Sequence, residues 1–312
     1  MEELRLSANA VLPVFLMMAA GYLSRCLGVL ERGDVAKFNR VAFRVFLPCL
    51  LFYNVYRSDL SAAVDPRLIA YAVLGVLIVF GAAFVTVQRL ERVNERRGVI
   101  MQGIFRSNYV ILGLPIAQAL LGETELGPVS VLIAIVVPLF NVLAVFVLER
   151  FRGGSVKPRE VALQVLKNPL VVSSALGIAA LLIGLKLPPV LEKAVSGLGT
   201  IATPLQLFLL GAFFRFNGLR RYFKPLAAVT VIKLVVTPAI FLSLAAALGF
   251  RGVAFVALLG IFASPTAVNS FTMAQQMGGD AELAGDIVVS TSVFSALTMF
   301  GWIFLFKTLG VF

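Results

Sequence analysis

Two stretches decide the fold of this chain: NYVILGLPI at Asn108–Ile116 and ASPTAVNSF at Ala263–Phe271. Each lies inside an apolar run long enough to cross a membrane, and each contains a helix breaker: Gly113 and Pro115 in the first, Pro265 in the second. A proline removes one hydrogen bond of the helix and clashes with the preceding turn. In lipid the freed carbonyl needs another partner. Both helices are therefore predicted to be broken and to line a cavity.

The composition around these stretches is that of a membrane protein. Apolar residues make up 60% of the 312 residues and charged residues only 14%. About ten apolar stretches are long enough to span a bilayer, so we expect an all-α integral membrane protein with ten transmembrane helices. The first apolar run lacks a small-residue cleavage site before the next charges and is predicted to be a span, not a removed signal.

The order of the spans predicts an internal repeat. The two interrupted stretches fall in the fourth and ninth spans, and Pro48 and Pro204 form a matched pair in the second and seventh. Two halves of five spans each must be inverted relative to one another. We therefore expect a single membrane domain with one five-helix repeat at 1–148, a basic cytoplasmic loop at 149–168 and a second, inverted repeat at 169–312, in which helices four and nine cross.

The positive charge predicts orientation. The net charge is +11, and seventeen Lys and Arg residues lie in the odd-numbered connections, against seven at the other side. The positive-inside rule places the odd connections in the cytoplasm and both termini outside. This topology accounts for the basic character without nucleic acid, so we expect a plasma-membrane protein whose surroundings are lipid.

Polar residues at the two interruptions are the candidate substrate contacts. Ser264 followed by Pro265 has the pattern of an N-cap and first helical residue. Two half-helix N-termini would direct partial positive charge to the middle of the membrane, which favours an anion. For the asparagines, hydrogen bonding between helices is the alternative. The candidates are Asn108, Tyr109, Gly113, Pro115, Ser264, Pro265, Asn269 and Ser270, with Asn54, Asn141, Gln206 and Gln275 as weaker ones.

At these residues the sequence resembles the auxin efflux carrier family, which includes plant auxin exporters and bacterial permeases for malonate and malate. The resemblance covers nearly the whole chain and implies a fold like that of bile-acid sodium symporters. It also implies crossing broken helices, a scaffold domain, elevator-type alternation of access and a homodimer. The long hydrophilic loop of the plant exporters is missing, which favours a bacterial-type carrier over one for auxin. The matching residues are Pro48, Asn108, Gly113-Leu114-Pro115, Pro204-Leu205, Gly211, Pro265, Asn269, Phe271, Ala274 and Gly278-Gly279-Asp280.

Two cations within the spans have several interpretations. Arg106 and Lys233 either reach the membrane surface with their long side chains or face the cavity as counter-charges for a carboxylate. Lys233 has a third interpretation, in which it takes the place of a coupling cation. Sodium coupling would instead need oxygen ligands near the crossing, for which hydroxyls and amides such as Thr266 are available. The chain has no His, and we expect no metal site and no cofactor.

These features together predict a secondary transporter for a small organic anion, such as a mono- or dicarboxylate. A channel and a sodium-coupled symporter for a different organic solute are the alternatives. An enzyme is excluded because the acidic residues are scattered and none lies near the middle of a span. We therefore expect the anion to be the partner, with alternating access as the mechanism.

Overall fold

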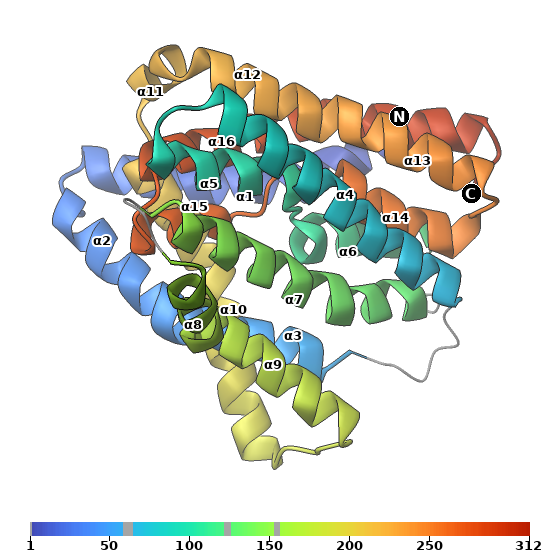
Figure 1. The fold of residues 1–312 in the computed structure, drawn as a ribbon, viewed down its shortest axis with the longest axis horizontal. Coiled ribbons are helices and arrows are strands. Elements are labelled where there is room, and N and C mark those ends of the chain that lie inside the picture. Colours follow the sequence, from blue (N-terminus) through green and yellow to red (C-terminus); the bar gives the residue numbers. More distant parts are fainter. Residues whose placement is uncertain (1, 59–64, 122–125, 153–156) are drawn as a thin grey trace.

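The computed structural model describes residues 2–58, 65–121, 126–152 and 157–312, and nearly all of them are helical (Figure 1). The helices of the N-terminal part are α1 (Glu2–Cys26), α2 (Arg32–Val41), α3 (Leu47–Tyr56), α4 (Pro66–Leu90), α5 (Asn94–Phe105), α6 (Leu114–Leu121) and α7 (Gly127–Arg150). The remaining helices are α8 (Pro158–Lys167), α9 (Pro169–Leu182), α10 (Pro189–Phe213), α11 (Phe216–Arg221), α12 (Phe223–Val231), α13 (Thr237–Ala247), α14 (Gly252–Ala263), α15 (Asn269–Gln276) and α16 (Ala281–Thr308).

Long apolar helices dominate the described chain. Five are long and apolar enough to cross a membrane: α4, α7, α10, the continuous α12–α13, and α16. A sixth is possible if α8 and α9, which meet at a bend of 59°, form one span. The all-helical membrane class is thus confirmed, whereas the ten-span inverted repeat stays a prediction. The expected loop at 149–168 contains helix α8, and its residues 153–156 lie outside the described part.

Helix starts follow from side chains that the sequence places there. Asp65 accepts a hydrogen bond from the Arg67 N–H, and Asn168 accepts one from the Leu170 N–H. Each thereby satisfies one of the N–H groups that a helix leaves without a partner at its first turn. A proline follows each cap at the first helical position, where its missing N–H costs nothing.

Helices α1 and α10 pack with their backbones in contact. A Cβ atom at Gly211 would lie 1.9 Å from the Met18 carbonyl oxygen, and one at Gly21 would lie 1.8 Å from that of Phe208. Any larger residue at either glycine would therefore push the two helices apart. Helix α10 also packs on α3, and α3 on α9, so these four helices form one group of neighbours.

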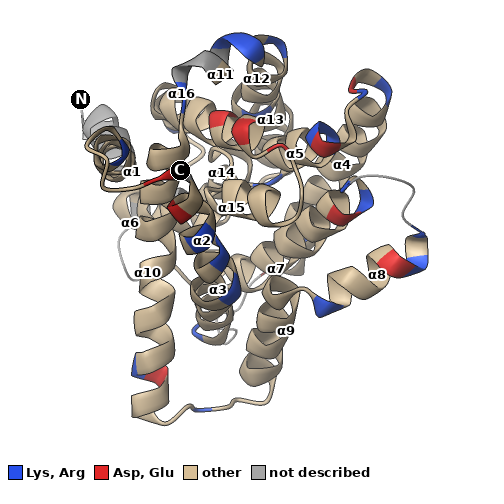
Figure 2. Ribbon diagram, turned by 90° about the vertical axis from the view of Figure 1, so that its left-hand side faces the viewer, with Lys and Arg blue, Asp and Glu red and all other residues tan. Residues whose placement is uncertain are grey.

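The other long helices surround the middle of the chain. Helix α5 packs on α4 and α7, α14 on α13 and α7, and α12 on α16 (Figure 1). Figure 1 also shows the N- and C-termini at the same end of the molecule. Figure 2 looks onto the opposite end, where Lys and Arg gather on α2, α5, α8 and α11. Basic residues of several of the odd-numbered connections therefore lie at this end of the fold.

Candidate transport site

Two interrupted helices cross at the centre of the molecule. Helix α5 ends at Phe105, and the chain resumes as a π-helical turn at Tyr109–Gly113 that continues into α6. Helix α14 ends at Ala263, and α15 begins at Asn269. Between these ends, Ser107 and Thr266 pair as an isolated antiparallel β-bridge. The Asn108 N–H donates to the Pro265 carbonyl at 2.8 Å, so backbone bonding holds the two interruptions together.

Each interruption supplies a hydroxyl to the other. Pro265 has no N–H, so the carbonyl of Ile261 loses its helical donor, and the Ser107 hydroxyl donates to that carbonyl instead. In return, the Thr266 hydroxyl donates at 2.8 Å to the carbonyl of Gly103, in the last turn of α5. Last-turn carbonyls have no helical partner. The crossing therefore satisfies the carbonyls that the interruptions free, and we call these two bonds the reciprocal hydroxyl bonds.

The first interruption lies elsewhere than Pro115 suggests, whereas the second contains Pro265 as predicted. The first interruption is at residues 106–108, while Pro115 sits inside the continuous helix that follows. Ser264 is wrongly predicted as an N-cap: it caps the C-terminus of α14 with an extended backbone, φ −65° and ψ 148°. The β-bridge holds Thr266 extended, so the next helix begins at Asn269, five residues after Ser264.

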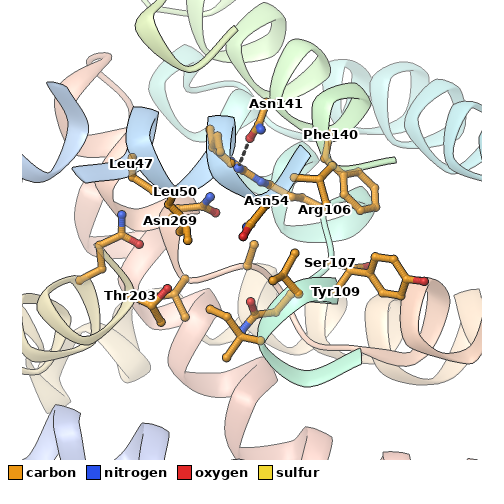
Figure 3. Close-up of a pocket in the computed structure, with 18 residues that line it drawn as sticks. Leu47, Leu50, Asn54, Arg106, Ser107, Tyr109, Phe140, Asn141, Thr203 and Asn269 are labelled. Atoms are coloured by element: carbon orange, nitrogen blue, oxygen red, sulfur yellow. Dashed lines mark hydrogen bonds between the residues drawn. The ribbon is translucent and has the colours of Figure 1, made fainter. Parts of the chain in front are cut away.

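Tyr109 packs against two glycines at the crossing. A Cβ atom at Gly113 would lie 2.5 Å from the Tyr109 ring, and one at Gly260 would lie 2.7 Å from it. The hydroxyl of Tyr109 donates to the Val129 carbonyl at 3.4 Å. Figure 3 shows the ring directed away from the other labelled side chains. Gly113 thus lets α6 approach α14, and the Tyr109 ring forms part of that contact.

A cavity of about 70 Å³ lies beside the crossing (Figure 3). Its walls come from both interruptions and from α3, α7 and α10. The cavity therefore lies where the crossing meets the group of helices that includes α3 and α10. Its polar lining residues are Asn54, Arg106, Ser107, Asn108, Tyr109, Asn141, Thr203, Gln206 and Asn269.

Arg106 is the charged residue of this lining. Its side chain is 2% exposed, and it donates to the Asn141 side-chain oxygen at 2.5 Å, the dashed line in Figure 3. Its other terminal nitrogen lies against the Met273 sulfur. In the part of the chain that the structure describes, no ion pair includes Arg106. Arg106 does not extend to the membrane surface, and it presents a buried positive charge at the cavity.

Two further cavity residues have polar atoms without hydrogen-bond partners. These are the Nε2 of Gln206 and the Oδ1 of Asn269, both shielded from solvent. Burying a polar atom without a partner costs roughly 1–3 kcal/mol. One is a donor and the other an acceptor, so a bound polar molecule would satisfy both.

The crossing brings together some of the predicted contacts and separates others. Asn108, Tyr109 and Asn269 line the cavity, as do Arg106 and the weaker candidates Asn54, Asn141 and Gln206. Lys233 is buried behind the crossing, where its ammonium donates to the Ser107 hydroxyl. Ser107 and Thr203 also line the cavity but were not predicted, because a single hydroxyl in an apolar span is common. Outside the described lining are Gly113, Pro115, Lys233, Ser264, Pro265, Ser270 and Gln275.

The two ends of the site differ. A second, more open cavity of about 270 Å³ shares Asn54 and Val110 with the first and extends to Arg57. At the other end, Asn39 on α2 is fully buried and binds α15 twice, to Gln275 at 2.5 Å and to Thr272 at 2.7 Å. Asn39 and Arg57 are about 27 Å apart along one continuous helix. The first cavity thus adjoins a more open one toward Arg57, while the other end of this helix is bonded to α15.

Comparison with known proteins identifies the class of this chain. The sequence profile of a family described as "Membrane transport protein" matches residues 6–303. The chain belongs to this family. A relative from Rhizobium meliloti named "Putative malonate transporter" is 26% identical over 305 residues, which cover 96% of this chain and 95% of the relative.

Two archaeal relatives are likewise named transporters. One from Methanothermobacter thermautotrophicus is 24% identical, with 95% of this chain and 97% of the relative covered. One from Methanocaldococcus jannaschii is 22% identical, with 95% and 98% covered. The family match confirms the resemblance to auxin efflux carriers. The protein is therefore a membrane transporter and not an enzyme.

Proposed function

We propose that the protein is a secondary carrier that moves a small carboxylate across the plasma membrane by alternating access. The observation that carries this proposal is the position of Arg106, a buried guanidinium in the cavity wall with neutral partners. A buried charge is costly unless it is paired. A substrate carboxylate would pair with Arg106, because a guanidinium binds the two oxygens of a carboxylate side by side.

The backbone at the cavity adds to this attraction. The π-helical turn at Tyr109 and helix α15 at Asn269 both begin beside the cavity. Helix N-termini carry partial positive charge, which favours an anion. The Ser270 and Phe271 N–H groups already donate to the Ala267 and Val268 carbonyls, so helix α15 adds this partial charge rather than free donors. The partnerless Gln206 amide supplies a donor from α10. Arg106 provides the full charge.

The size of the cavity supports a small acid. A water molecule needs roughly 10–15 Å³ of such space, so a cavity of about 70 Å³ holds about five waters. That is comparable to the carbon and oxygen atoms of a three-carbon dicarboxylate. The name of the Rhizobium relative points to the same size class. We therefore take malonate as the first compound to test.

Alternating access follows from the difference between the two ends of the site. A more open cavity that reaches Arg57 adjoins the site, and Asn39 binds Gln275 and Thr272 at the other end of the same helix. In this proposal the Arg57 end is the open side and the Asn39 end is the closed side. Transport then requires the contact between α2 and α15 to separate while the Arg57 end closes. The reciprocal hydroxyl bonds favour motion of the crossing as one body, as in an elevator between two inverted repeats. The family resemblance adds a homodimer to this proposal, and the positive-inside rule adds the orientation with both termini outside.

The decisive test is substrate counterflow in proteoliposomes with labelled malonate. Arg106→Gln keeps most of the side-chain length and removes the charge. Loss of one partner of a buried charge pair costs about 2 kcal/mol or more, so we expect at least a roughly thirtyfold loss of malonate affinity. Arg89→Gln, at an exposed position in the last turn of α4, is the control and is expected to behave as the wild type.

Wild-type affinity in Arg106→Gln, with normal purification, would contradict a carboxylate bound at Arg106. Counterflow also separates the two classes of transport protein. A carrier exchanges labelled for unlabelled substrate and saturates, whereas a channel does neither. Absence of counterflow together with a non-saturating flux in the wild type would replace the carrier by a channel.

A further inference from the structure

A second buried cation lies behind the crossing. Lys233 is 1% exposed and sits in a π-helical turn at Ile232–Val236, which joins α12 to α13 and packs against both α5 and α14. Such turns interrupt a helix at a cost and are frequent at functional positions. Among the described residues, none forms an ion pair with Lys233. Its ammonium donates to Ser107, and Lys233 is not part of the cavity lining.

The contact with Ser107 places this ammonium at a carbonyl freed by proline. The Ser107 hydroxyl donates its hydrogen bond to the Ile261 carbonyl, and its oxygen accepts a hydrogen bond from the Lys233 ammonium. Ile261 lies in the last turn of α14, whose end carries partial negative charge. Lys233 thus acts through one hydroxyl on the C-terminal end of a half-helix.

In carriers with broken helices, coupling cations bind at unwound carbonyls and at the C-terminal ends of half-helices. We propose that the Lys233 ammonium occupies the position of a coupling cation, so that this carrier binds its anion without sodium. Removal of the ammonium would turn the back of the crossing into a site for a soluble monovalent cation. The inference rests on the proposed carrier function and adds to it the source of the balancing charge.

The equivalent position behind the other interruption is neutral. There the Thr266 N–H donates to the Thr291 hydroxyl at 3.2 Å, and that hydroxyl donates to the Ile287 carbonyl at 2.8 Å. On each side of the crossing a second polar side chain thus contacts the interrupted segment. Behind Thr266 this side chain is the neutral Thr291, and behind Ser107 it is the charged Lys233. If the group behind Ser107 served only to hold the crossing together, a neutral side chain such as that of Thr291 would be sufficient at position 233.

The experiment measures the melting temperature of the purified protein in sodium, potassium or choline chloride at equal ionic strength, with and without malonate. For the wild type we expect the same malonate-induced rise in all three salts and no rise from sodium alone. Lys233→Ala is expected to lose the malonate rise in choline. It should gain a rise from sodium alone, because an ion that binds only the folded state stabilises it. Sodium should also restore its response to malonate.

Lys224→Ala is the control. Lys224 is exposed in the first turn of the same long helix, so this change removes one positive charge without touching the crossing and should match the wild type. A wild-type response that requires sodium overturns the inference. So does a Lys233→Ala protein that binds malonate normally in choline, or one that sodium neither stabilises nor restores. Lys233→Met fills the space of the side chain and serves if the alanine variant does not fold.

The outcomes also separate the inference from the proposed function. A wild type that responds to malonate only in sodium contradicts the role of Lys233 and leaves the carrier proposal standing. A wild type that responds to no carboxylate in any salt contradicts the carboxylate proposal. In that case the sodium-induced rise in Lys233→Ala, measured without any acid, still decides whether Lys233 occupies a cation position.

Discussion

The interruption between α5 and α6 and that between α14 and α15 each leave a carbonyl without its helical donor, and each of these carbonyls accepts from a hydroxyl of the other interruption. The two interruptions differ in charge. The first carries Arg106 and is backed by Lys233, whereas the second carries neutral groups such as Ser264 and Asn269. Both segments thus provide the hydrogen bonds that hold the crossing together, whereas the positive charge that favours an anion lies at the first interruption alone.

A large effect on stability is expected when either of the reciprocal hydroxyl bonds is removed. Ser107→Ala and Thr266→Val each leave a buried carbonyl without its donor, which costs about 1–3 kcal/mol of folding stability. We therefore expect both variants to melt several degrees below the wild type. Malonate affinity should fall further in Ser107→Ala, because this change also removes the hydrogen-bond acceptor of Lys233. Equal loss of affinity in both variants would show that the electrostatics are shared as well.

A smaller effect is expected from Asn269→Ala on the neutral side. The Oδ1 of Asn269 has no partner, so its removal should leave the melting temperature of the free protein nearly unchanged. If the side chain binds substrate, one neutral hydrogen bond worth about 1 kcal/mol is lost. Isothermal titration with malonate should then report an affinity about fivefold weaker. An affinity loss as large as that of Arg106→Gln would place the recognition on both segments.

The smallest effect is expected at Ser264. Its hydroxyl is completely buried and has no hydrogen-bond partner. Removing a polar atom that is already unsatisfied relieves a desolvation cost. Ser264→Ala should therefore leave malonate transport unchanged and keep or slightly raise the melting temperature. A clear loss of counterflow would show that Ser264 contacts the substrate at another stage of the cycle.

The membrane class and the existence of two interruptions could be predicted from the sequence, because apolar length and Pro265 leave a direct trace in it. The second interruption contains Pro265 as predicted, but the position of the first could not be predicted. The first interruption lies at residues 106–108, which contain no proline or glycine. Its backbone is instead held in an extended conformation by the pairing of Ser107 with Thr266. Such pairing links residues far apart in the chain, so local sequence carries no sign of it.

The candidate site was predictable to the extent that polarity in an apolar span marks an inward-facing residue. Asn108, Asn141, Gln206 and Asn269 all line the cavity for this reason. The same rule cannot separate the cavity from the back of the crossing. From the sequence, Lys233 and Arg106 were both cations within spans that could reach the membrane surface or face the cavity. Only the fold places Arg106 at the cavity and Lys233 behind Ser107.

The reciprocal hydroxyl bonds also bear on how the protein is made. The Gly103 carbonyl receives its donor from Thr266, 163 residues later in the chain. At roughly 5–20 residues per second, a ribosome needs about 8–30 seconds to reach Thr266 after Gly103 has been synthesised. During that interval the segment that pairs with Ser107 and donates to Gly103 does not yet exist. The first interruption therefore takes its final structure only after the second half of the chain has been synthesised.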